Sequence, residues 1–163
     1  FILLPPMSHY EIFFAYLLAS IARGLAVGLC VWVVALYFVP LAPARPLWVL
    51  AFGLLSCGIM GTLGIIAGLW SEKFDQLSAF QNFLILPATF LSGVFYSIHT
   101  LPPFWLAVSH WNPLFYTIDG FRYGFFALAD VSPWRSLAVV AGVFVVLAAA
   151  ALRLLASGYK LRN

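Results

Sequence analysis

Residues 76–118 read QLSAFQNFLILPATFLSGVFYSIHTLPPFWLAVSHWNPLFYTI, a long stretch without one Asp, Glu, Lys or Arg. A membrane-spanning helix needs about 20 apolar residues. Prolines at positions 87, 102, 103 and 113 interrupt the stretch, so one straight helix cannot account for it. Irregular backbone at membrane depth occurs where it is buried in protein or lines a cavity. The stretch therefore predicts one crossing of the bilayer, followed by broken structure at membrane depth or in the interface.

The composition excludes an ordinary soluble protein. The chain of 163 residues is 64% hydrophobic and only 8% charged, whereas charged residues make up about a quarter of a soluble domain. Its eight Lys and Arg residues are spread along the chain, so no basic run offers a site for nucleic acid or for anionic lipid headgroups. We therefore expect an all-α, polytopic membrane protein without a nucleic-acid partner.

Hydropathy predicts one transmembrane domain over residues 1–163, with four spans and a hairpin. The spans lie at about residues 12–39, 47–70, 78–97 and 134–156, and the hairpin at about residues 98–132. An even number of spans places both chain ends on one side of the membrane. Basic residues on that side are Lys73, Arg153, Lys160 and Arg162, against Arg45, Arg122 and Arg135 on the other side. This bias places both ends in the cytoplasm.

The first residues predict that the chain is part of a longer protein. The chain begins with Phe1, and no charged residue precedes its first apolar stretch. It therefore has neither a natural start nor a signal peptide. We expect it to be the C-terminal part of a longer polypeptide.

Two charged residues of the first predicted span are candidates for a pathway or an interface, Glu11 and Arg23. An arginine near the bilayer centre costs about 2.5–3.5 kcal/mol on insertion scales. In one interpretation residues 8–23 lie partly in the interface, and the span shifts to residues 24–44. In the other, Arg23 faces a protein-lined or wet interior. Glu11 lies about 120° around a helix from Arg23, so it is not an obvious partner.

Small residues recur every three or four positions along the second predicted span. They are Gly53, Cys57, Gly61, Gly64 and Gly68. This spacing places them on one helical face that another helix can approach closely, and Gly24 with Gly28 repeats the pattern on the first span. A helix-packing face is favoured over a ligand groove. Cys30 and Cys57 lie in apolar stretches without metal or redox spacing, so both are interpreted as small hydrophobic residues.

The predicted hairpin is rich in aromatic residues, which are typical of the boundary between lipid and water. Pro102 and Pro103 suit a helix start, and Asn112 before Pro113 suits a break followed by a second start. These features predict an interfacial or re-entrant helical hairpin on the outer side of the membrane.

Asp119 and Arg122 lie three residues apart within this hairpin, close enough on a helix to form an ion pair at the outer boundary. In one interpretation the pair sets the orientation of the hairpin. In the other, Arg122 meets anionic or sugar groups of a substrate that leaves the membrane. The sequence leaves both interpretations open.

No motif for catalysis or ATP hydrolysis is present. The sequence lacks a phosphate-binding loop and a nucleophile motif, and His99 and His110 have no neighbour at metal-ligand spacing. We therefore predict a protein that is not an enzyme and binds neither a cofactor nor a metal. All its carboxylates fall at predicted ends or loops, which argues against proton-coupled transport.

Residues 71–126, from SEKFDQ to RYGFF, resemble the C-terminal signature of type-2 ABC transporter permeases. The likeness is to the branch of nodulation-signal, polysaccharide and drug exporters, and residues 6–25 and 157–163 also resemble that branch. The resemblance therefore covers nearly the whole chain. Two departures are small. Ala88 stands where a Leu is frequent, and Ala127 stands where a Gly is frequent.

The resemblance assigns several residues to family motifs. The motif at the outer end of the fifth span matches Pro87, Ser92, Gly93, Phe95 and Tyr96. The hairpin motif matches Pro102, Pro103, Asn112, Pro113 and residues 120–124, which include Arg122. Family members have six spans, so the four predicted here would be the last four, with residues 1–7 as the end of the cytoplasmic coupling region.

The resemblance also implies a function and partners. Family members act as homodimers or heterodimers of permeases, bound to two copies of a separate ATPase subunit that drives export. The expected protein is thus a subunit of the bacterial cytoplasmic (inner) membrane that moves a glycan, a lipid-linked or a drug-like substrate outward, in contact with membrane lipid. One alternative is an ion-coupled or passive carrier or channel without an ATPase. Another is a membrane scaffold that transports nothing.

Overall fold

The computed structural model describes residues 8–71, 73–94 and 102–157, and most of these residues lie in helices. In chain order they are α1 (His9–Phe38), α2 (Pro46–Trp70), α3 (Phe74–Phe80), the π-helical segment η1 (Gln81–Ile85), α4 (Leu86–Phe90), α5 (Pro103–Trp111), α6 (Pro113–Phe126) and α7 (Pro133–Ala156). No strand occurs in these ranges, so the predicted all-α class is confirmed.

Prolines and polar caps set where the helices begin. Proline occupies the first turn of α2, α5, α6 and α7, where a missing N–H costs no helical hydrogen bond. Ser8 and Glu11 form a capping box at the start of α1. Asn112 caps α6 by accepting a hydrogen bond from the Leu114 amide. The helix starts predicted at the hairpin prolines are therefore confirmed.

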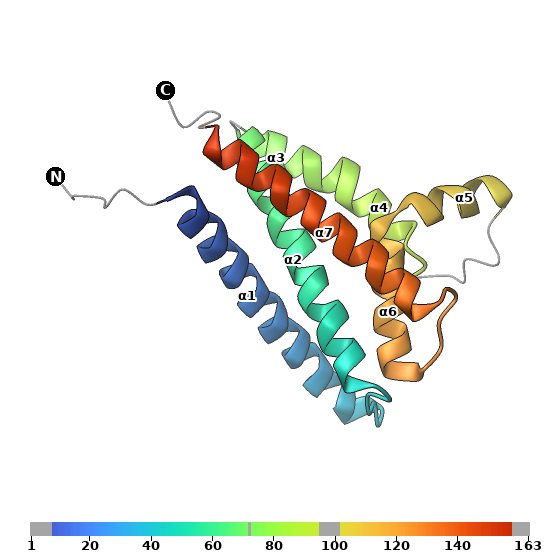
Figure 1. Cartoon of the computed structure of the whole chain (residues 1–163). Coiled ribbons are helices and arrows are strands. Elements are labelled where there is room, and N and C mark those ends of the chain that lie inside the picture. The colour runs from blue at the N-terminus through green and yellow to red at the C-terminus, as the bar shows by residue number, and fades with distance from the viewer. Residues whose placement is uncertain (1–7, 72, 95–101, 158–163) are drawn as a thin grey trace.

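Helix α2 lies at the centre of the bundle and contacts α1, α6 and α7 (Figure 1). Helix α1 begins and α7 ends at the same end of the bundle, while α5 and α6 lie toward the other end. One buried cluster joins α2, α6 and α7 through Phe52, Ile59, Phe115, Tyr116 and Val140. A second cluster joins α1 and α7 through Phe13, Leu17, Ala151 and Leu155.

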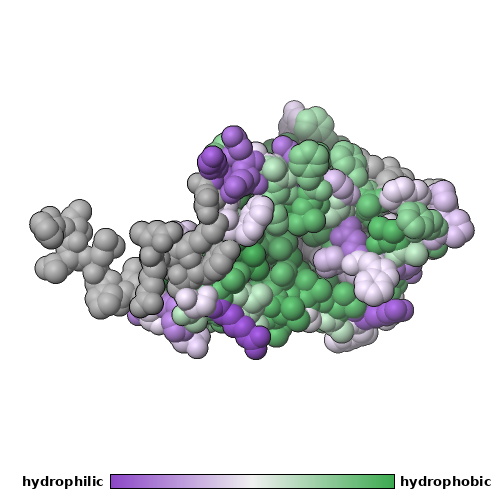
Figure 2. All heavy atoms as spheres, turned by 90° about the horizontal axis from the view of Figure 1, so that it is seen from above, coloured by the Kyte–Doolittle hydropathy of each residue, from purple (hydrophilic) through white to green (hydrophobic). Residues whose placement is uncertain are grey.

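Three of the described helices, α1, α2 and α7, are long and apolar enough to cross a membrane. Large hydrophobic side chains cover the outside of the bundle, and Figure 2 shows a broad hydrophobic surface with hydrophilic residues at its margins. A surface of this kind is suited to lipid, since soluble monomers rarely expose large apolar patches. The chain is a multi-pass membrane protein.

The third predicted span, residues 78–97, corresponds to the helical run α3–η1–α4. This run begins at Phe74 and ends at Phe90, earlier at both ends than predicted, and a turn follows it. Residues 95–97 of the predicted span lie outside the described residues. Few residues of the run contact the other helices, and the contacts are to α2 and α6. It is the least packed long segment of the described chain.

Helix α6 ends at Phe126 and is capped by Ala127, which has a φ of 56° in the left-handed region. A side chain is strained there and glycine is not. We expect Ala127→Gly to raise the free energy of unfolding by about 0.5–1 kcal/mol. Thermal unfolding in detergent measures the change. The matched control Ala138→Gly, inside α7, should lower stability by about 1 kcal/mol, and equal effects at both positions would contradict the assignment.

Candidate functional site

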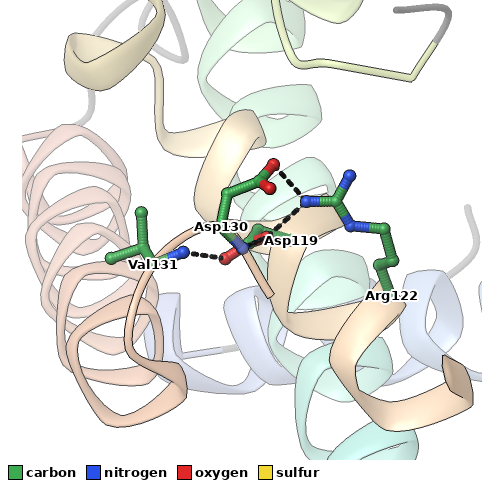
Figure 3. Close-up of polar contacts among 4 residues, drawn as sticks. All are labelled: Asp119, Arg122, Asp130 and Val131. Carbon is green, nitrogen blue, oxygen red and sulfur yellow. Dashed lines mark hydrogen bonds and ion pairs between the residues drawn. The ribbon is translucent and has the colours of Figure 1, made fainter. Parts of the chain in front are cut away.

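Three charged residues meet where the hairpin joins α7. Asp119 and Arg122 come from consecutive turns of α6, and Asp130 comes from the loop that leads to α7 (Figure 3). The Asp119 carboxylate accepts hydrogen bonds from Arg122 Nη2 at 2.8 Å, from the Asp130 amide at 2.8 Å and from the Val131 amide at 3.1 Å. Arg122 Nη2 also pairs with the Asp130 carboxylate. The ion pair predicted from the three-residue spacing is present, and a second carboxylate joins it.

Asp119 and Arg122 differ in how deeply they are buried. Asp119 is 1% exposed and lies in the middle of α6, although the sequence placed every carboxylate at an end or in a loop. Arg122 is 33% exposed in its side chain. Burial by itself lowers the pKa of Arg122, but the hydrogen bonds and charges of Asp130 and Asp119 outweigh it and raise that pKa. The guanidinium is therefore a fixed cation that holds two carboxylates.

The cluster fixes the path of the chain between two helices. Two backbone amides of the loop, those of Asp130 and Val131, donate hydrogen bonds to the buried Asp119 carboxylate. If the loop moved away from α6, both amides would lose their acceptor. This geometry gives the ion pair an orienting role, while the exposed third of the Arg122 side chain stays available for a substrate. The amides and Asp130 were not foreseen from the sequence, because they lie eleven or twelve residues beyond Asp119 in a loop without a motif.

A second polar contact ties the loop before α2 to the end of α6. The amides of Ala44 and Arg45 donate to the carbonyls of Phe125 and Gly124, at 3.2 and 2.8 Å. The Arg45 guanidinium lies 4.6 Å from the centre of the Tyr123 ring, and its Nη1 donates to the hydroxyl of that ring. An arginine next to a proline was the one feature of the sequence that pointed toward this contact.

Close packing of α1 on α2 uses some of the predicted small residues and not others. A Cβ atom added at Gly24 would lie 2.4 Å from Cys57 Sγ, whereas one at Gly28 would meet nothing within 4 Å. A Cβ atom added at Gly61 would lie 2.1 Å from Ser20 Oγ of α1, so Gly61 lies at a tight contact. A Cβ atom at Gly53 would make ordinary contacts, and one at Gly64 or Gly68 would meet no heavy atom within 4 Å. The predicted packing face is thus divided, with contact in its first part and open space in its second part.

Three further tight contacts lie at glycines that the packing pattern missed. A Cβ atom at Gly120 would lie 2.2 Å from the Phe52 ring, and one at Gly124 would lie 2.9 Å from the Val49 amide nitrogen. Gly58 faces the Phe144 ring in the same way, at 2.7 Å. The four-residue spacing of Gly120 and Gly124 was the signal available.

The open part of the predicted face lines a groove of about 950 Å³ between α1 and α2. Arg23 lies on this groove near the middle of α1 and is exposed. Helix α1 ends at Phe38, so a span shifted to residues 24–44 is wrong for its last six residues. Glu11 does not face Arg23, because its carboxylate accepts from the Ser8 amide at 2.8 Å in the capping box.

Of the residues assigned to the end of the fifth span, Ser92 and Gly93 lie in a turn after α4. Ser92 is buried, and its hydroxyl donates to the Thr89 carbonyl. Gly93 has a φ of 79°, which glycine adopts without strain. Asn112 Nδ2 donates to the Ala88 carbonyl at 2.5 Å, which joins α4 to the start of α6. Pro87 lies in the first turn of α4, and Phe95 and Tyr96 lie outside the described residues.

The helical run that contains α4 also carries the π-helical segment η1. Wider turns of this kind are frequent at functional sites. Gln81 and Asn82 lie in η1, and both are exposed. Two side-chain amides therefore lie on the outside of a largely apolar helix, where contact with lipid alone would leave them without hydrogen bonds.

Comparison with known proteins identifies the family. The family described as ABC-2 type transporter matches residues 2–126 of the chain. The chain belongs to the ABC-2 type transporter family. The match includes the whole of α6, with Asp119 and Arg122, and ends before the loop with Asp130.

Among the relatives of this family member are proteins named inner membrane transport permease YadH, from Escherichia coli strain K12, from Escherichia coli O157:H7 and from Shigella flexneri. Each is 38% identical over 145 residues, which are 89% of this chain and 55% of the relative. The chain thus spans about half the length of the curated relatives it matches. No solved structure matches it. With its apolar helices, the chain is a membrane-embedded member of this family.

Proposed function

We propose that the chain is part of the permease subunit of an ATP-driven exporter, which moves a glycan, a lipid-linked or a drug-like substrate out across the bacterial inner membrane. The observation that carries this proposal is the family match over residues 2–126, on a bundle of membrane-spanning helices. Two permeases, identical or different, would pair with two copies of a separate ATPase. Both ends of the chain would lie in the cytoplasm, with Lys73 and Arg153 on that side.

The surface of α3–η1–α4 supports a pathway between two such permeases. This run packs loosely on its own chain, and it exposes Phe83 and Leu84 beside the amides of Gln81 and Asn82. A mixed surface of aromatic, aliphatic and amide groups suits an amphipathic substrate better than it suits lipid tails. We assign the run to the face that meets the partner permease and the substrate, and the hairpin α5–α6 to the outer mouth.

The geometry of the acidic residues disfavours the alternative of a proton-coupled carrier. Such a carrier needs a carboxylate at membrane depth that can gain and lose a proton. Asp119 is the buried carboxylate of the described chain, and three hydrogen-bond donors already occupy it. Glu11 caps α1, and Asp75 is exposed in the first turn of α3. None of these three has the environment of a proton carrier.

The proposal is tested by purifying, from native membranes, a tagged protein that is as long as the relatives. We expect an ATPase subunit to co-purify and its activity to depend on the permease. Reconstitution into liposomes provides the second measurement. Transport without ATP or ATPase would support the carrier, whereas assembly with partners but no transport in either assay would support the scaffold.

Replacing Arg122 separates the two interpretations of the charged cluster. We expect Arg122→Ala to reduce export more than it reduces the amount of inserted protein, because the side chain is one third exposed at the proposed outer mouth. Export is measured in vesicles and corrected for protein level, with Arg135→Ala as a control at an exposed arginine of α7. Equal losses of protein level and export at Arg122 would leave only the structural role.

A further inference from the structure

The groove between α1 and α2 combines an apolar lining with one charge. Its volume is about 950 Å³, and side chains of α1, α2 and the end of α7 line it. Arg23 is the charged residue of this lining, and no Asp or Glu accompanies it there. Gly64 and Gly68 form part of the wall and leave open space in front of α2. The groove therefore has room for an apolar group such as a helix, but the positive charge of Arg23 in it is not neutralised by the groove lining.

Arg23 has no counter-ion within the described chain. It takes part in neither of the ion pairs described there, which both belong to Arg122. It lies about 22 Å from either end of α1 at 1.5 Å per residue, in a helix long enough to cross the membrane core of about 30 Å. With α1 centred in the bilayer, Arg23 lies about 15 Å, half the core thickness, from either headgroup layer. A cation at this depth needs a carboxylate or other polar partner from protein.

A second copy of the same surface is a poor partner for this groove. A symmetric contact centred on the groove would bring the two Arg23 side chains together. Like charges that face each other cost free energy, and the groove lining offers no carboxylate to relieve them. The partner must instead combine an apolar, helix-sized surface with a negative charge.

The length of the relatives points to the source of such a helix. The matched 145 residues are 55% of each relative, so roughly 120 residues of a relative lie outside the match, and one span needs about 20. We propose that, in a protein of its relatives' length, the groove receives a membrane-spanning helix from the part of the polypeptide that this chain does not contain. That helix places an Asp or Glu side chain against Arg23. The inference depends on the membrane placement of the chain and not on its substrate or ATPase.

Photocrosslinking in the full-length protein identifies what fills the groove. A photoreactive residue replaces Met60, which lines the groove and is 39% exposed, and a control replaces Val146, which is 67% exposed on α7 away from the groove. We expect Met60 to crosslink within one polypeptide, to a peptide outside the region aligned with this chain, and Val146 not to give that product. Crosslinks from Met60 only to a second copy, to another subunit or to lipid would overturn the proposal. This readout holds whether or not an ATPase co-purifies.

Charge exchange tests the predicted carboxylate. Arg23→Glu should lower the folded fraction after a heat challenge by about tenfold, because two carboxylates would then face each other at membrane depth. Replacing the acidic residue of the crosslinked peptide by Arg in the same protein should restore the folded fraction. Arg135→Glu at the exposed start of α7 is the control and should change little. The pairing would be overturned if Arg23→Glu left the folded fraction unchanged, or if the reciprocal exchange did not restore a lowered folded fraction.

Discussion

Replacing Gly120 with alanine is expected to lower the free energy of unfolding by about 2–3 kcal/mol, because a side chain added there overlaps the core. The new Cβ atom would lie 2.2 Å from two atoms of the Phe52 ring and 2.4 Å from a third. Phe52 is fully buried and stacks on Trp48 with ring centres 5.9 Å apart. The ring cannot turn aside without disturbing its neighbours, so α6 must move away from α2.

Thermal unfolding in detergent, followed by size-exclusion fluorescence, measures this loss. The matched control is Gly142→Ala on α7, where an added Cβ atom meets nothing within 4 Å and helix propensity alone favours alanine. A second change, Phe52→Leu in the Gly120→Ala background, should restore part of the stability because it removes the ring that the methyl group meets. If Gly120→Ala melted like Gly142→Ala, the close packing of α6 on α2 would be wrong.

Removing the Asp119 carboxylate should have the largest effect of any single polar change, about 3–5 kcal/mol for Asp119→Ala. The substitution leaves the amides of Asp130 and Val131 without their acceptor and takes one of two carboxylates from Arg122. Asp119→Asn should lose less, because its amide oxygen can still accept one of these hydrogen bonds. The loop between α6 and α7 is expected to open first.

Hydrogen exchange of the Asp130 and Val131 amides, together with thermal unfolding, measures the role of Asp119. Asp75→Ala is the control, since Asp75 is exposed in the first turn of α3. A double-mutant cycle with Arg122→Ala gives the coupling between the paired residues. Slow exchange at both amides in Asp119→Ala, or a melting temperature equal to that of Asp75→Ala, would show that the carboxylate does not hold the loop.

The agreement between sequence and structure is best where a local feature decides the outcome. Prolines and an Asn cap predicted the starts of α5 and α6, and hydropathy predicted α1, α2 and α7 to within a few residues. The pair of Asp119 and Arg122 followed from helical spacing. Each of these features depends on residues within a few positions of one another, so the local sequence is enough to predict it.

The larger disagreements concern contacts between distant segments. The periodic glycines of α2 predicted one packing face, yet Gly64 and Gly68 face open space and Gly58 makes a tight contact instead. Periodicity shows which residues share a face, but it does not show which neighbour meets that face. The groove and the role of Asp130 were missed for the same reason.

The sequence by itself determined the class, the helices and the family of this protein, because apolar length, proline position and motif order are properties of neighbouring residues. Only the tertiary structure decided that α6 packs inside the bundle on α2 and α7, that one buried carboxylate holds the loop before α7, and that Arg23 lines a groove. These features arise when helices distant in sequence come together, and close packing and burial then select which side chains touch.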